Sequence, residues 1–68
     1  SEPYPFPSQD ELYQMPTSFI LSTRISAELR PHGIETIGDL AAKKDVIGKL
    51  KGVTGEETRR ALRFYHIQ

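Results

Sequence analysis

Residues that end helices recur at short intervals along this chain, and they restrict it to short helices. Pro16 ends a first helix, because proline lacks the backbone donor that a helix interior needs. A second helix is expected over 23–30 with Ser22 as its N-cap. Pro31 and then Gly33 end that helix, since glycine readily adopts the left-handed conformation of a helix stop.

N-capping residues predict where the other helices begin. Ser8 starts the first helix, Thr36 caps a third, and Asp45 caps a short and irregular fourth. Thr54 and Glu57 have the spacing of a capping box and predict the start of the last helix. No strand of useful length is evident. The fold class predicted is therefore all-α, a compact bundle of four or five short helices.

Apolar residues at helical spacing indicate which faces form the core. Leu21, Ile25 and Leu29 recur every four residues and are expected to face inward. Phe19, Ile20 and Leu21 are expected to insert into the core before that helix. Inward positions are also expected in the two last helices, at Val46, Ile47, Leu50, Thr58, Ala61, Leu62 and Tyr65.

Length and charge limit the possible functions. A chain of 68 residues forms one domain with a thin core, and without cysteine it has neither a disulfide nor a thiolate metal site. Residues 1–20 carry three acids and no base, whereas residues 21–68 carry nine bases and six acids. A dedicated DNA-binding domain is usually more basic. No membrane-spanning run or signal peptide is evident, so an intracellular setting and no membrane partner are expected.

The N-terminal part of the chain differs in composition from the rest. Residues 1–17 are predicted to be an extended proline and aromatic arm followed by the short helix, and residues 18–68 to be the helical domain. The arm either binds a groove on another protein or acts as a linker whose aromatic side chains lie on the domain. The candidate protein-interface residues are Tyr4, Phe6, Tyr13, Phe19, Ile20 and Phe64.

The segment 50–55 before the last helix is similar to the turn of a helix-hairpin-helix. Such a turn directs backbone N–H groups at a DNA phosphate, as helix N-termini do. Here Gly52 and Gly55 are three residues apart rather than two, and Glu56 and Glu57 follow where lysines are usual. An ordinary helix-helix turn with good caps is the alternative.

Basic residues gather in the last helix. Arg59, Arg63 and His66 form one stripe with Arg60 beside it, and this stripe is expected to face outward. It either binds phosphates or an acidic partner, or it is a solvated helix face. No pattern of catalytic residues, metal ligands or a cofactor loop is present, so no enzyme, metal or cofactor is expected. The candidate DNA-binding residues are Arg24, Arg30, Gly55, Arg59, Arg60 and Arg63.

Two stretches carry a resemblance to a known family. Ile34-Glu35-Thr36-Ile37-Gly38-Asp39-Leu40 and Ala61-Leu62-Arg63-Phe64-Tyr65-His66 resemble motifs in the C-terminal domain of the Rap-interacting factor one family. Those proteins regulate telomeres, replication timing and DNA repair. Residues 21–68 also resemble the C-terminal domain of the bacterial RNA polymerase alpha subunit.

The resemblance implies a nuclear, non-enzymatic module at the end of a very large protein. Related domains self-associate as dimers or tetramers, bind branched DNA and dock partners such as the Bloom helicase. The DNA-contacting arginine of the polymerase domain corresponds to Arg24, a neighbouring basic position to Arg30, and its turn glycine to Gly55. Its contact asparagine is Ala27 here, and Glu56 and Glu57 replace its lysines. The prediction is an interaction module with modest DNA binding; the alternative is a structure-selective DNA-binding domain that uses an arginine surface.

Overall fold

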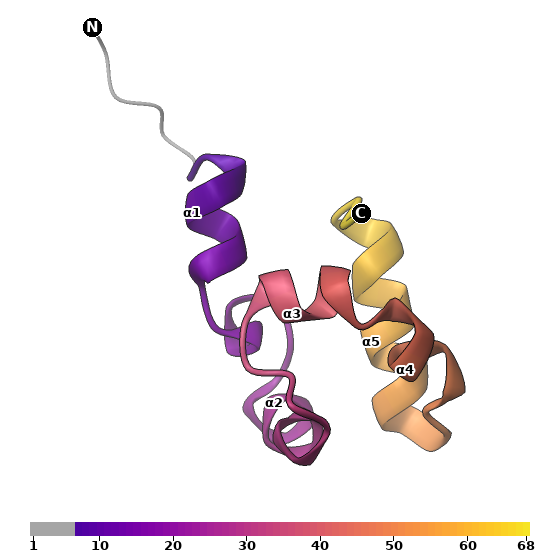
Figure 1. Ribbon diagram of the computed structural model, residues 1–68. Coiled ribbons are helices and arrows are strands. Elements are labelled where there is room, and N and C mark those ends of the chain that lie inside the picture. The colour runs from indigo at the N-terminus through magenta and orange to yellow at the C-terminus, as the bar shows by residue number, and fades with distance from the viewer. Residues whose placement is uncertain (1–6) are drawn as a thin grey trace, which may run out of the picture.

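The computed structural model of the chain describes residues 7–68, which form five short α-helices and no β-strand (Figure 1). The predicted all-α class is confirmed. Two 3-10 turns, Thr17–Phe19 and Arg30–His32, precede and follow the second helix. The helices are α1 (Gln9–Gln14), α2 (Thr23–Leu29), α3 (Ile37–Ala42), α4 (Lys44–Lys49) and α5 (Gly52–Phe64).

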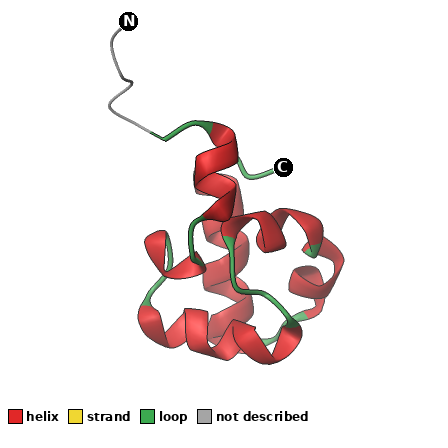
Figure 2. Ribbon diagram, turned by 60° about the vertical axis from the view of Figure 1, so that its left-hand side comes forward, coloured by secondary structure: helices red, strands yellow, loops and turns green. Residues whose placement is uncertain are grey.

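The helices pack as a bundle around the central α3 and the long α5. Helix α1 packs on α3, α2 packs on α5, and α4 lies between α3 and α5 in both the chain and the packing. Figure 2 shows the same bundle from the side, with short loops joining the helices. The core is made of buried aliphatic side chains from α2, α3, α4 and the segments that follow α2 and α5, namely Ile25, Leu29, Ile34, Ile37, Leu40, Ile47 and Ile67.

The stretch 34–40 forms the centre of this core. Ile34, Ile37 and Leu40 are fully buried, and the Thr36 hydroxyl accepts a hydrogen bond from the Asp39 backbone N–H at 3.1 Å. The Asp39 carboxylate accepts in return from the backbone N–H of Thr36 at 3.0 Å, which completes a capping box. The same carboxylate accepts from Glu35 N–H, and these bonds to the charged form lower the pKa of Asp39.

Helix α1 shares the core of the rest of the bundle. Ser8 and Glu11 form a capping box at its start, which confirms the predicted helix start at Ser8. After the helix, the Met15 carbonyl accepts from Ile37 N–H at 2.9 Å and Thr17 N–H donates to the Glu35 carbonyl at 3.1 Å. Helix α1 and the segment after it therefore contact α3 and the segment before it, although the composition changes after residue 17.

Two predicted caps are wrong. Helix α4 begins after Lys43, so Asp45 lies inside its first turn, and α5 begins after Lys51, so Thr54 is already helical. Gly52, with a φ of 71°, starts α5 in a conformation that other residues rarely adopt. The Thr54 hydroxyl instead donates to the Glu28 carboxylate and joins α5 to α2.

The predicted inner stripe of α5 is correct for Thr58, Ala61 and Leu62 but wrong for Tyr65. Tyr65 is 45% exposed because α5 ends at Phe64 and the chain then turns. His66 adopts a φ of 54°, and the Ile67 N–H donates to the Leu62 carbonyl at 2.9 Å. This turn places Ile67 in the core in place of Tyr65.

Candidate functional site

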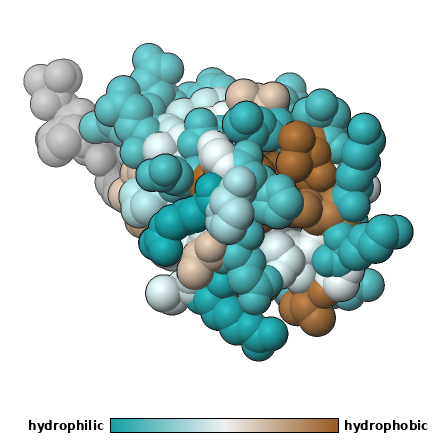
Figure 3. Space-filling view, turned by 60° about the horizontal axis from the view of Figure 1, so that its bottom comes forward, coloured by the Kyte–Doolittle hydropathy of each residue, from teal (hydrophilic) through white to brown (hydrophobic). Residues whose placement is uncertain are grey.

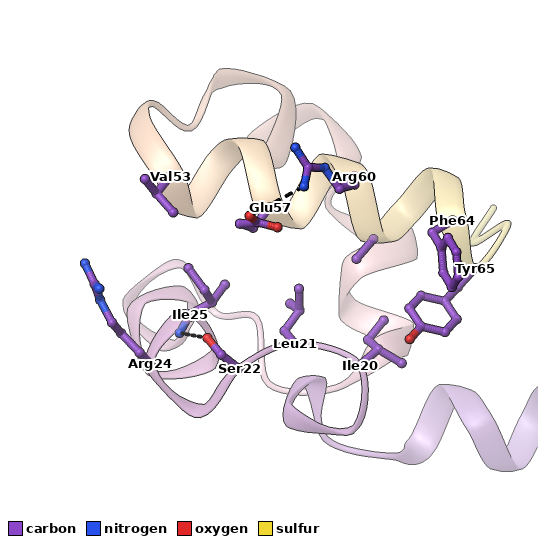
Figure 4. Close-up of a pocket in the computed structure, with 11 residues that line it drawn as sticks. Ile20, Leu21, Ser22, Arg24, Ile25, Val53, Glu57, Arg60, Phe64 and Tyr65 are labelled. Carbon is purple, nitrogen blue, oxygen red and sulfur yellow. Dashed lines mark hydrogen bonds and ion pairs between the residues drawn. The ribbon is translucent and has the colours of Figure 1, made fainter.

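An apolar groove separates α5 from the segment that leads into α2. Its volume is about 470 Å³, and its lining is mainly apolar. In Figure 4, Leu21 and Ile25 point toward α5 and Val53 points back toward them, whereas Phe64 and Tyr65 lie at one end and Arg24 at the other. We call this the apolar groove; it is lined by Ile20, Leu21, Ser22, Arg24, Ile25, Val53, Glu57, Arg60, Ala61, Phe64 and Tyr65.

Large apolar side chains on α5 remain exposed along this groove. Val53 is 58% exposed and Phe64 is 72% exposed. The Phe64 and Tyr65 rings meet edge to face with centroids 4.9 Å apart, which fixes their relative orientation. Figure 3 shows hydrophobic residues reaching the surface in separate patches bordered by hydrophilic ones. A small domain with a thin core has few large apolar side chains, and two of them, Val53 and Phe64, are exposed along one groove. Apolar side chains exposed in this way are a candidate interaction surface.

The charges at the edge of the apolar groove are of both signs. Arg24 Nε lies 3.5 Å from Glu28 Oε2, and Arg60 Nη1 lies 3.8 Å from Glu57 Oε1. The hydrogen bond from the Thr54 hydroxyl, and to a smaller extent Arg24, lowers the pKa of Glu28. These pairs are exposed and contribute little to stability, but they leave neither arginine as an isolated positive charge.

A second groove lies between α5 and α4. Its volume is about 510 Å³, and we call it the basic groove because its charged lining residues are all basic. Ile47, Leu62 and Ile67 provide apolar lining, and Gly48 leaves one side without a side chain. The full lining is Lys44, Ile47, Gly48, Arg59, Leu62, Arg63, His66, Ile67 and Gln68.

Arg59 has a structural role at the edge of the basic groove. Its Nη1 atom donates to the carbonyl oxygens of Ile47 at 2.9 Å and of Leu50 at 2.8 Å. Ile47 lies in the last turn of α4 and Leu50 is its C-cap residue, and the Ile47 carbonyl also accepts from the Leu50 N–H at 3.2 Å. The prediction that Arg59 belongs to an exposed basic stripe is therefore wrong, since this half-buried side chain ties α4 to α5.

Gly55 also has a packing role. It is buried, and a Cβ atom there would collide with the Leu50 carbonyl oxygen and lie 2.8 Å from Arg59 Nη1. Gly55 therefore allows α5 to pass close beneath the turn at Leu50, and the turn is a closely packed helix-helix connection.

The structure distributes the predicted DNA-binding arginines over different surfaces. Arg24 and Arg60 line the apolar groove, while Arg63 lines the basic groove with Arg59. Arg30 is exposed in the 3-10 turn after α2 and lines neither of these grooves.

The predicted interface residues are divided in the same way. Ile20 and Phe64 line the apolar groove. Phe19 is 52% exposed outside it, so the prediction that Phe19 inserts into the core is wrong. Tyr13 is half-buried against the core. Tyr4 and Phe6 lie outside the described residues.

Sequence reasoning missed two residues that line these grooves. Val53 is an apolar residue in the first turn of α5 that lies outside the predicted core stripe. An apolar residue at such a position is the sequence signal that could have indicated a surface site. Lys44 was not among the predicted binding residues, but it lines the basic groove.

The described residues offer no evident metal site. Within residues 7–68, no three His, Cys, Asp or Glu side chains are grouped so that they could hold an ion. In the same range, none of the helices has the length and apolar character needed to cross a membrane. Comparison with protein-family models, with curated proteins and with solved structures finds no match to this chain.

Proposed function

We propose that this chain is a non-enzymatic interaction module that self-associates through the apolar groove. The observation that carries the proposal is that one surface combines a concave groove with a protruding aromatic side chain at its end, Phe64. A two-fold symmetric dimer brings the same patch of both copies together, so each copy must supply both a groove and a side chain that fills the groove of the other copy. The apolar groove meets that requirement, because Phe64 of one copy can enter the groove of the other.

The charges at the groove edge favour a second copy over a partner of one charge sign. Arg24, Arg60 and Glu57 all line the groove, so an opposed copy presents each sign to the other. Burying one phenylalanine contributes about 1.5–3 kcal/mol, and a symmetric pair does so twice. This gain is reduced by the entropy cost of association, so a dimer that dissociates on dilution is expected.

Sedimentation equilibrium over a concentration series tests the proposal. The wild-type mass should rise from monomer toward dimer, and Phe64→Ser should remain monomeric. Phe19→Ser is the matched control, because it removes an exposed phenylalanine that does not line the groove. A wild-type chain that stays monomeric at every concentration, or a Phe64→Ser variant that associates as the wild type does, would contradict self-association at this groove.

The cellular setting we propose follows from the resemblance of 34–40 and 61–66 to the Rap-interacting factor one family. In this setting the module lies at the C-terminus of a large nuclear regulator of telomeres, replication timing and DNA repair, and docks repair or replication proteins such as the Bloom helicase. Interferometry with purified Bloom helicase and the immobilised domain tests this part. Absence of binding at micromolar concentrations would remove the Bloom helicase as a direct partner.

Structure-selective DNA binding is the second candidate, and one observation favours it. Arg63 and Lys44 line a groove with no acidic residue. Against it, Arg24 and Arg60 are paired with glutamates, and Arg59 is engaged with backbone carbonyls. Gel shifts on branched DNA at low and high salt, with Arg24→Glu combined with Arg63→Glu, separate the two functions. Salt-sensitive binding that the double variant abolishes would establish the DNA surface.

A further inference from the structure

The basic groove has unpaired positive charge at its edge. Lys44 and Arg63 are exposed, and within residues 7–68 neither forms an ion pair. His66 lines the same groove, and none of the lining residues is acidic. The apolar groove on the other side of α5 differs, because its arginines lie beside glutamates. The basic groove is therefore complementary to an anionic ligand.

The apolar lining of the basic groove narrows the class of that ligand. Ile47 and Ile67 are buried core residues that nevertheless line the groove, and Leu62 lies with them. A Cβ placed on Gly48 would meet no atom within 4 Å, so the groove is open on the α4 side. An aliphatic side chain that enters here can contact Leu62, which is only half-buried among these apolar residues.

The walls of the basic groove are held in place before any ligand arrives. The two hydrogen bonds of Arg59 fix α4 against α5. On the other side, Ile67 N–H bonds to the Leu62 carbonyl and His66 N–H to the Arg63 carbonyl at 3.2 Å, which holds the turn after α5. A ligand that binds a preformed groove loses less free energy in ordering it.

We propose that the basic groove docks an acidic segment of a partner protein that inserts an aliphatic side chain between α4 and α5. This inference deepens the proposed function, on which it rests, by assigning partner docking to a surface separate from the one used for self-association. Charge complementarity selects the acidic segment, and the Ile47, Leu62 and Ile67 lining selects the aliphatic side chain. Nucleic acid fits less well, because no phenylalanine, tyrosine or tryptophan lines the groove to stack on a base.

Chemical-shift titration of the isotope-labelled domain tests this proposal and detects weak binding. The probes are a glutamate-rich peptide that contains leucines, the same peptide with serine for leucine, the same peptide with lysine for glutamate, and a DNA duplex. The leucine-containing acidic peptide should shift the backbone amides of Gly48, Arg63 and Ile67. Affinity should fall about tenfold when leucine is replaced, and binding should be lost when glutamate is replaced.

Charge reversal locates the site. Lys44→Glu combined with Arg63→Glu should weaken peptide binding by at least about tenfold. Lys49→Glu combined with Lys51→Glu is the matched control, because it makes the same change in charge at exposed positions outside the basic groove and should bind as the wild type does.

Three results would overturn the proposal: no shifts with the acidic peptide, shifts confined to the apolar groove, or tighter binding of the DNA duplex at the same amides. The test is independent of self-association. The apparent mass of the Lys44→Glu and Arg63→Glu variant should rise with concentration as the wild-type mass does. Phe64→Ser should stay at the monomer mass but still bind the peptide.

Discussion

The two grooves lie on opposite sides of the same helix, and they differ in what surrounds the arginines of α5. Arg60 lies beside Glu57 at the apolar groove, whereas Arg63 at the basic groove forms no ion pair within residues 7–68. Arg59, one residue before Arg60, is bound to carbonyls of the turn after α4. Neighbouring arginines on one helix therefore have different roles, because each role is set by the element that the side chain meets.

The largest effect is expected at Gly55, where α5 passes close to the turn after α4. Gly55→Ala would force the added Cβ into the Leu50 carbonyl and against Arg59, and so displace α4 from α5. We expect the free energy of unfolding to fall by about 3 kcal/mol, as measured by urea denaturation. Gly48→Ala is the control: its Cβ meets nothing within 4 Å, and alanine should stabilise α4 by about 0.5–1 kcal/mol. Equal effects of the two variants would contradict the close approach at Gly55.

A smaller effect on the free energy of unfolding is expected at Arg59, and Arg63 is the matched comparison. Arg59→Met keeps most of the side-chain length but removes the side-chain donor to the carbonyls of Ile47 and Leu50, so the free energy of unfolding should fall by about 2 kcal/mol. Arg63→Met, at an exposed position, should change it by less than about 0.5 kcal/mol. Denaturation of both variants under one set of conditions measures the difference. If Arg63→Met is the more damaging substitution, the two arginines have been assigned the wrong roles.

The cap of α3 contrasts with the start of α5, which has no side-chain cap. Asp39→Asn removes the charge that accepts from Glu35 and Thr36, and should cost about 1 kcal/mol at neutral pH. The pKa of Asp39 is lowered by folding, so this contribution is complete above the unfolded value of about 3.9 and is lost as the pH falls through the lower folded value.

Denaturation as a function of pH checks this sign. The stability difference between wild type and Asp39→Asn should shrink on acidification below about pH 4. A difference that stays constant down to low pH would show that the charge of Asp39 has no part in the cap.

The smallest effect is expected at Ser26, a buried residue of α2. Its hydroxyl is buried and has no hydrogen-bond partner among the described residues. Ser26→Ala removes the unsatisfied group, and the free energy of unfolding should rise by up to about 1 kcal/mol. Thermal unfolding followed by circular dichroism is sufficient to detect the change. A decrease in stability would indicate that the hydroxyl makes a bond that the static structure lacks.

Much of the fold follows from local sequence signals, because those signals act within one turn of helix. Ser8, Ser22 and Thr36 cap the helices that were predicted to follow them, and Gly33 has the left-handed φ of 76° expected of a helix stop.

Two of the incorrect predictions, for Arg59 and Thr54, involve contacts between residues that are distant in sequence. The role of Arg59 depends on the position of the last α4 carbonyls, and the role of Thr54 depends on Glu28 in another helix. Tyr65 loses its expected place in the core because Ile67 occupies it after an unusual turn at His66. The two grooves could not be predicted for the same reason, since each is formed by segments brought together only in the folded chain.

Intermolecular nuclear Overhauser effects in a mixture of labelled and unlabelled chains test the self-association of the apolar groove most directly. The proposal predicts contacts between the Phe64 ring of one copy and the methyl groups of Leu21 and Ile25 of the other. It also predicts that Phe64→Ser abolishes them, whereas Lys44→Glu with Arg63→Glu leaves them in place. Contacts that instead join Ile47 and Ile67 across copies, or the absence of any intermolecular contact at millimolar concentration, would contradict it.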